Sequence, residues 1–148
     1  MSWKSLGVLV ATMAFCTSLL AQNEPFLGIW KLHTSDSQQP SQMIVNVPAP
    51  EGFTSIRVNI GQDNKSSAEN HPVAFDGKPY STTGGDARQI SYKRIDANTI
   101  ERTQDRNGKV SVDTEQVSKD GKTLTIKPAN GGAVRVFDKQ FSVQPVER

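Results

Sequence analysis

Cysteine is almost absent from the 148-residue chain, because its single cysteine, Cys16, lies within the first 21 residues. Residues 22–148 therefore form no disulfide, and a domain of this length has to be held together by its hydrophobic core. A lipid anchor on Cys16 is not expected, since the residue before an acylated cysteine is normally small and here it is Phe15.

Apolar residues are also scarce once the N-terminal segment is set aside. The first 21 residues contain 14 of them, whereas residues 22–148 contain 38, about 30 %. Lys4 precedes an apolar stretch at Leu6–Leu20, and the small Ala21 follows it, which is the order of a secretory signal peptide. The stretch is too short for a membrane-spanning helix. We expect residues 1–21 to be removed on export, and residues 22–148 to form one secreted or periplasmic domain with no stable membrane insertion.

An excess of one charge is lacking as well. Residues 22–148 carry 16 Lys and Arg against 15 Asp and Glu, and the longest basic run is the pair Lys93–Arg94. A nucleic-acid groove needs a clustered basic surface, so no nucleic-acid partner is expected.

Patterns typical of catalysis and of metal binding are missing too. His33 and His71 are the only imidazoles, and neither has the spacing of a catalytic triad or of a metal site. The paired glycines at Gly84-Gly85 and Gly131-Gly132 precede no helical pattern, so they do not form a phosphate-binding loop. We expect a protein that is not an enzyme and that uses no metal or cofactor.

Turn-forming residues recur every 8 to 14 positions between short segments of alternating apolar and polar residues. This spacing is typical of an antiparallel all-β sandwich or barrel, in which each strand has one buried face. The strands are expected near residues 26–33, 41–47, 53–61, 67–75, 87–95, 99–105, 109–118, 122–128 and 134–141. We predict an up-and-down β-barrel of eight or nine strands over residues 22–148.

Three hairpins are expected to have three-residue loops closed by a residue that tolerates positive φ: Asp96-Ala97-Asn98, Arg106-Asn107-Gly108 and Lys119-Asp120-Gly121. This register pairs Arg94 with Ile100, Tyr92 with Arg102, Arg102 with Val112, Ile100 with Thr114, Thr114 with Ile126, and Gln116 with Leu124. All the alternating apolar residues then share one face. A two-residue Asn107-Gly108 loop would separate Ile100 from Val110 and Val112, and is therefore disfavoured.

The inner face that follows from this register mixes apolar and polar side chains. A filled sandwich core would not tolerate its two arginines and two glutamines, whereas a barrel lumen holding water or a polar-headed ligand would. The residues predicted to bind a ligand are Tyr92, Arg94, Arg102, Gln104 and Gln116. Inward arginines suit a carboxylate or another anion. Alternatively, Arg94 and Arg102 form ion pairs at the barrel rim with Glu101 or Asp113.

The segment Phe26-Leu27-Gly28-Ile29-Trp30 opens the expected domain. Its Gly-x-Trp pattern on a first strand resembles that of the lipocalin and calycin families. The resemblance implies that Gly28 leaves room for a backbone crossing and that Trp30 closes one end of the barrel. It also implies an Arg or Lys from a late strand stacked on the indole, for which Arg135 and Lys139 are the candidates.

Further segments, similar in order and spacing, resemble the small exported lipocalin-like proteins of environmental bacteria, a family without an assigned function. They are Phe75–Tyr80, Tyr92–Glu101, Val117–Ile126 and Val136–Gln140. The leading hypothesis is an exported barrel that binds a small hydrophobic or amphipathic molecule, anionic in one form of the hypothesis. The alternative is a protein-interaction module, such as a protease inhibitor or an envelope partner, acting through the loops at Pro48–Gly52 and Lys78–Thr83. A lumen packed shut by Trp30, Phe75, Ile90 and Tyr92 would favour this alternative.

Overall fold

The computed structural model describes residues 24–34, 41–63 and 65–143, so the expected signal peptide lies outside the described part of the chain. The described residues form ten β-strands and no helix, and therefore no helix that could cross a membrane. The strands are β1 (Gly28–Leu32), β2 (Ser41–Ala49), β3 (Gly52–Ile60), β4 (Ser66–Val73), β5 (Tyr80–Ser81), β6 (Gln89–Asp96), β7 (Thr99–Arg106), β8 (Lys109–Val117), β9 (Thr123–Pro128) and β10 (Arg135–Phe141).

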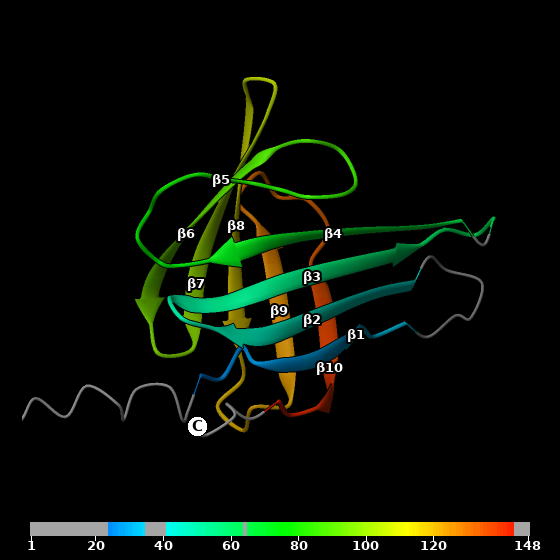
Figure 1. Ribbon diagram of the computed structural model, residues 1–148. Coiled ribbons are helices and arrows are strands. Elements are labelled where there is room, and N and C mark those ends of the chain that lie inside the picture. The colour runs from blue at the N-terminus through cyan, green and yellow to red at the C-terminus, as the bar shows by residue number, and fades with distance from the viewer. Residues whose placement is uncertain (1–23, 35–40, 64, 144–148) are drawn as a thin grey trace, which may run out of the picture.

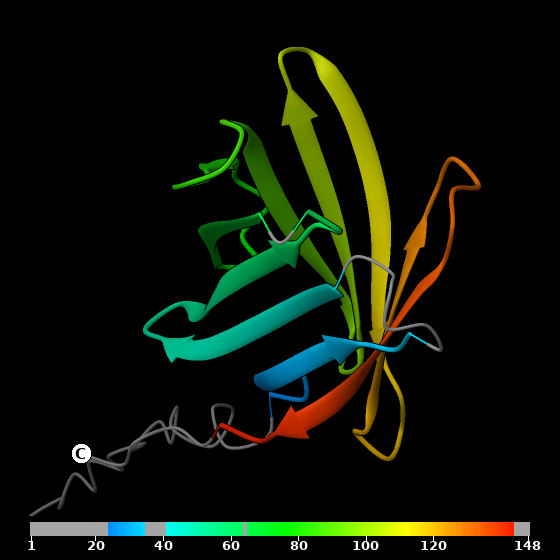
Figure 2. The same ribbon diagram turned by 90° about the vertical axis from the view of Figure 1, so that its right-hand side faces the viewer.

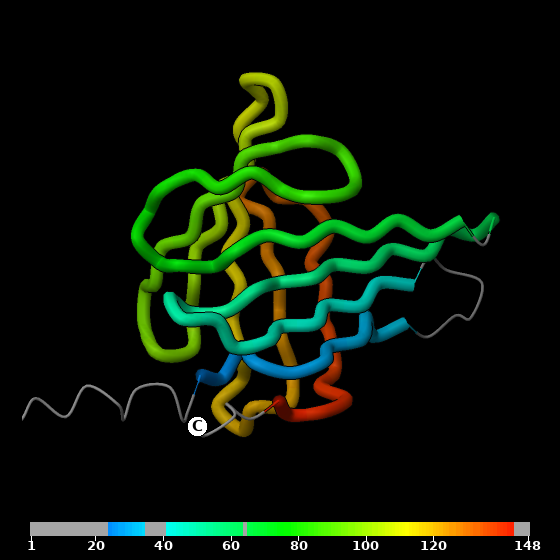
Figure 3. Tube along the Cα trace, in the orientation of Figure 1, coloured from blue at the N-terminus to red at the C-terminus, as the bar shows by residue number. Residues whose placement is uncertain are grey.

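The ten strands make one antiparallel sheet in the order β4-β3-β2-β1-β10-β9-β8-β7-β6-β5. β1 pairs with β10, and the backbone of β4 is joined to the segment after β5 by a single β-bridge, between Asn70 and Thr83. The sheet is thus an almost closed up-and-down barrel, in which β1–β4 cross over β7–β10 (Figures 1 and 2). Apart from the pairing of β1 with β10, strands that are neighbours in the sheet are also consecutive in the chain, as the trace in Figure 3 shows. The predicted fold class is confirmed, with the two-residue β5 as an additional strand.

One end of the barrel is filled by an apolar cluster. Phe26, Trp30, Ile100, Leu124 and Phe137 have no exposed surface there. The segment before β1 caps this closed end, since Trp30 Nε1 donates to the Phe26 carbonyl at 2.9 Å. Burial of such side chains contributes roughly 1.5–3 kcal/mol each and supplies the main stabilisation of the domain.

The Gly-x-Trp pattern has the structural role that the resemblance implied, but with a different cation. Gly28 has φ 127°, and a Cβ there would lie 2.3 Å from the Phe141 carbonyl oxygen, so only glycine fits this crossing. Lys139 pairs with Trp30 and places its Nζ 4.5 Å from the indole ring. The expectation for Arg135 is wrong, because Arg135 begins β10 four residues earlier, roughly 13 Å along the strand and toward the open end.

The register is correct between β6 and β7 and wrong beyond Asn107. Arg94 pairs with Ile100 and Tyr92 with Arg102, as predicted. Asn107 and Gly108 have φ of 54° and 82°, and they form a two-residue turn in which Arg106 pairs with Lys109. Positive φ at both central positions is the type I′ geometry that Asn-Gly favours, and here it outweighs the apolar pattern.

This turn moves β8 by one residue relative to the prediction. Arg102 pairs with Asp113 and Ile100 with Glu115, so the predicted pairs with Val112 and Thr114 are wrong. On the other side of β8, the Ser118 amide donates to the Thr123 carbonyl, so the loop to β9 has four residues and not the predicted three. Ile126 therefore pairs with Glu115 and Leu124 with Val117, and the predicted pairs with Thr114 and Gln116 are wrong. Asp113, Glu115 and Val117 are buried, whereas Val110 and Gln116 are exposed. The carboxylates of β8, not its valines at the hairpin end, therefore face the lumen.

Candidate functional site

A network of buried charges crosses the middle of the lumen. Arg102 on β7 forms ion pairs with Asp113 and, through its Nε at 3.2 Å, with Glu115 on β8. Arg57 on β3, in the opposite wall, reaches Glu115 with its Nη2 at 2.7 Å. All four side chains are at most 10 % exposed. Burial opposes the charge of Arg57, but Glu115 and Tyr92 raise the pKa of its guanidinium above the ordinary value.

The network ends on two neutral groups. Arg57 Nη2 also donates to the Tyr92 hydroxyl at 3.4 Å, and this hydroxyl lies 2.9 Å from His71 Nε2. Burial raises the pKa of the Tyr92 phenol, which therefore keeps its proton. Burial, together with the positive charges of Arg57, Arg102 and Arg88, lowers the pKa of His71 to about 2. The imidazole is neutral over the physiological range.

A cavity of about 210 Å³ lies on the open side of this network. Its lining residues come from β2, β3, β4, β7 and β10 and from the segment that leads into β6. They include five arginines, Arg57, Arg88, Arg102, Arg106 and Arg135, but only one carboxylate, Glu69. Arg88 pairs with Glu69, and both are largely buried. We call this the arginine pocket.

Arg135 is the cation of the pocket that has no carboxylate partner among the described residues. Its Nη1 donates to the Gln42 amide oxygen at 3.1 Å. Burial, followed by repulsion from Arg102 and Arg57, lowers the pKa of Arg135. A guanidinium nevertheless stays charged in proteins, so the repulsion persists until an anion offsets it.

The pocket also contains donors without acceptors. The Nε–H groups of Arg57 and Arg88 are buried and have no hydrogen-bond partner among the described residues. Burial lowers the pKa of Arg88, and repulsion from other arginines lowers it further, although the negative charge of Glu69 acts in the opposite direction. Leaving a buried donor unpaired costs about 1–3 kcal/mol, so the pocket is suited to a ligand rich in acceptor oxygens.

The structure brings together three of the five residues predicted to bind a ligand. Arg102 and Gln104 line the arginine pocket, and Tyr92 lies behind it in the network. Arg94 lies at the closed end instead, where it pairs with Glu24 and stacks on Phe75 at 4.0 Å. Burial raises the pKa of Glu24 despite this partner.

Gln116, the fifth predicted residue, points away from the lumen, because the register of β8 differs from the prediction. Its side chain is exposed, and its Nε2 reaches Thr99 Oγ1 at 3.5 Å. The alternative expectation of ion pairs is confirmed in part. Arg102 does pair with Asp113, although inside the lumen and not at the rim, whereas Arg94 pairs with Glu24 instead of Glu101 or Asp113.

Sequence reasoning missed Arg57, Arg88, Glu69, Glu115 and His71. The alternation of Ile56, Val58 and Ile60 marks the outer face of β3, and its inner face carries Ser55 and Arg57. For β8 the sequence did contain the necessary information. The Asn107-Gly108 pair by itself predicts a two-residue turn, and that turn places Glu115 on the inner face. In the part of the chain that the structure describes, no three His, Asp or Glu side chains are placed to hold a metal ion.

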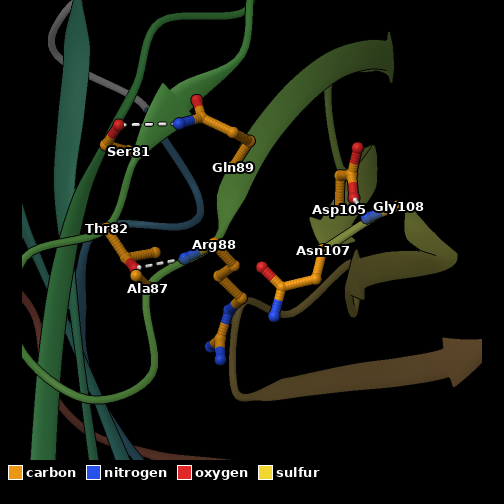
Figure 4. A pocket seen from close by; sticks show the side chains of 8 residues that line it. All are labelled: Ser81, Thr82, Ala87, Arg88, Gln89, Asp105, Asn107 and Gly108. Carbon is orange, nitrogen blue, oxygen red and sulfur yellow. Dashed lines mark hydrogen bonds between the residues drawn. The ribbon is translucent and has the colours of Figure 1, made fainter.

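A second depression, of about 360 Å³, lies outside the barrel between β5, the start of β6 and the β7–β8 hairpin (Figure 4). Several of its polar groups already pair with one another. Gln89 Nε2 donates to Ser81 Oγ at 2.7 Å, and the Gly108 amide donates to Asp105 Oδ1 at 2.8 Å. Since exposed loops form its walls, it is a weaker candidate than the arginine pocket despite its larger volume.

No protein-family model matches the chain, and no curated protein matches it either. Solved structures do. A fatty acid binding protein of Schistosoma mansoni, in complex with arachidonic acid, superposes with a TM-score of 0.56 at 13 % identity, over 79 % of this chain and 97 % of that one. The chain has the calycin-type barrel fold. Wild-type fluorescent protein UnaG gives 0.54 at 15 % identity, over 78 % and 98 % of the two chains. A UnaG point mutant gives 0.56 at 13 % identity, over 80 % and 99 %.

Proposed function

We propose that the protein binds a small organic anion in the arginine pocket at the open end of its barrel. The observation that carries the proposal is the charge of Arg135, which lies within a cavity of five arginines and has no carboxylate partner among the described residues. A carboxylate, phosphate or sulfate would offset this charge and accept from the unpaired Nε–H groups of Arg57 and Arg88.

The size of the pocket restricts the ligand further. Its volume of about 210 Å³ is below the range of roughly 300–1,000 Å³ that is usual for drug-sized ligands. The charged network crosses the lumen beneath it and the apolar cluster fills the closed end, so a long alkyl chain has no space there. The apolar part of the expected ligand would contact Met43 and Ile44 in the wall. The ligand is therefore compact, with one anionic group.

Export belongs to this proposal as well. The N-terminal 21 residues have the pattern of a signal peptide, and a barrel that takes up a small anion outside the cytoplasm agrees with that pattern. N-terminal sequencing of the protein secreted by its own host would give Gln22 as the first residue. A first residue upstream of Lys4 in the secreted or periplasmic fraction would refute cleavage at this site.

Isothermal titration calorimetry with benzoate and its neutral isostere benzamide tests the anion proposal. We expect benzoate to bind and benzamide to bind at least tenfold more weakly. Arg135→Gln should weaken benzoate binding by about tenfold to a hundredfold, since a hydrogen bond to a charged group contributes about 1.5–3 kcal/mol.

The matched controls lie outside the pocket. Lys93→Gln removes an exposed positive charge from the outer face of β6, and Arg94→Gln removes the arginine of the closed end. Both variants should bind benzoate as the parent does. An equal loss in Arg135→Gln and Lys93→Gln would mean that only the overall charge matters, and it would refute the pocket.

One observation favours the alternative of a protein-interaction module. Trp30, Ile90 and Tyr92 are at most 4 % exposed, so the closed half of the lumen is packed shut. The loop at Lys78–Thr83 would then be the docking element, and Asp76 orders its start by accepting from the Lys78 amide and from the Tyr80 hydroxyl. A partner captured from host extracts by the parent, but not by a Tyr80→Ala variant that still binds benzoate, would support this function.

A further inference from the structure

Beneath the arginine pocket lies a row of three buried polar side chains. Asn46 on β2 pairs with Ser55 on β3, and Ser55 pairs with His71 on β4. The next inward row toward the open end consists of Ile44, Arg57 and Glu69, all of which line the pocket. Directly opposed side chains on one face of a sheet have Cβ atoms about 4.5–5.5 Å apart, so the three polar groups converge. We call Asn46, Ser55 and His71 the polar row.

Each member of the polar row has one atom without a hydrogen-bond partner among the described residues: Asn46 Oδ1, Ser55 Oγ and His71 Nδ1. The three side chains are 3 %, 1 % and 1 % exposed. Buried polar groups in folded proteins are nearly always paired, with protein or with a bound molecule. Three unpaired atoms at adjacent positions therefore indicate an occupant between them.

The other bonds of these side chains fix what the occupant has to be. Asn46 Nδ2 donates to the Phe26 carbonyl at 2.8 Å, so the free Asn46 atom is the acceptor oxygen. Arg57 donates to the Tyr92 oxygen, which leaves the phenol proton to donate to His71 Nε2. A neutral imidazole that accepts at Nε2 carries its proton on Nδ1. The row thus offers a donor at His71, an acceptor at Asn46 and a hydroxyl, able to do both, at Ser55.

We propose that the polar row is a binding subsite for one neutral O–H group, which accepts from His71 Nδ1–H and donates to Asn46 Oδ1. The Asn46 oxygen would repel an anion, and the His71 N–H group would repel an ammonium group. An O–H group can hydrogen-bond to both, because it donates to the oxygen and accepts from the N–H. The group is either a resident water molecule or a hydroxyl of the ligand held above by the arginines. Only the second source rests on the proposed anion binding.

The first arm of the test is NMR spectroscopy of the ligand-free protein with His33 replaced by Gln, which leaves His71 as the only imidazole. We expect the proton of His71 on Nδ1 and a rotating-frame cross-relaxation peak between this proton and a bound water. Ser55→Val, which fills the row, should abolish the peak. Thr54→Val, which alters the neighbouring outward position on β3, should retain it.

The second arm compares benzoate with 2-, 3- and 4-hydroxybenzoate as probes, in which the distance from anion to hydroxyl differs. If the row takes a ligand hydroxyl, one isomer binds at least tenfold more tightly than benzoate and displaces the water peak. This preference disappears in Ser55→Val and persists in Thr54→Val. If the row holds water, the four probes bind alike and the water peak remains.

Either of these results supports the subsite. A His71 proton on Nδ1 that contacts only Ser55, with no water peak and no preference for a hydroxybenzoate, would overturn it, as would a proton on Nε2. If none of the probes binds, the anion proposal fails, and the water peak alone then decides the subsite.

Discussion

Acid should destabilise this protein through His71 in a way that can be calculated. The imidazole is 1 % exposed, and burial, with the positive charges of three nearby arginines, lowers its pKa to about 2 in the folded state. In the unfolded chain its pKa is close to 6.5. As the pH falls below 6.5, the unfolded state takes up a proton that the folded state does not. The contribution of His71 to the free energy of unfolding is thus fully present above pH 6.5, and below that pH it declines by about 1.4 kcal/mol per pH unit.

Urea unfolding at about pH 7.5 and about pH 4.5 measures this effect. The single tryptophan after residue 21, Trp30, is fully buried and reports unfolding by its fluorescence. We expect the free energy of unfolding to fall by about 2.7 kcal/mol more in the parent than in His71→Gln, whose amide still accepts from Tyr92 but does not titrate. His33→Gln is the control for an exposed imidazole and should retain the drop. Equal drops in the parent and in His71→Gln would refute the reasoning.

Three further substitutions test other contacts. Gly28→Ala should cost about 2 kcal/mol or more in urea unfolding, because its φ of 127° and the Phe141 carbonyl exclude a Cβ; a cost below about 0.5 kcal/mol would contradict the crossing. Lys139→Met should change Trp30 fluorescence and cost roughly 0.5–2 kcal/mol of stability, and an unchanged spectrum would count against the stacking. Glu115→Gln leaves buried guanidinium charge uncompensated and should cost about 3–5 kcal/mol; an increase in the melting temperature would argue against the network.

The architecture could be predicted because turns and alternation are local signals. Turn residues at short intervals located nine of the ten strands, and the Gly-x-Trp pattern located the closed end. The two-residue β5, by contrast, is too short to show an alternating pattern in the sequence. It pairs with β6 through Tyr80 with Ile90 and Ser81 with Gln89. Its existence depends on β6, which offers it a free edge.

The site could be predicted only in part, because the assumption that apolar residues face inward fails on two strands. On β3 and β8 the inner face carries Arg57 and Glu115, which stabilise each other across the lumen. Neither residue is compatible with burial unless its charge is paired, and the ion pair between them joins positions that lie 58 residues apart in the chain. Pairing over such a distance leaves no mark on local periodicity. The Asn107-Gly108 turn was the one local sign of the inverted face.

The central claim is that an anion binds among the arginines of the open end, and their side-chain Nε–H signals test it most directly. In a proton–nitrogen NMR titration with benzoate, we predict downfield shifts at Arg57 and Arg88, whose Nε–H groups are buried and unpaired, together with a shift at Arg135. Saturating benzoate that leaves these three signals in place, or that moves only Arg94 at the closed end, would contradict the account.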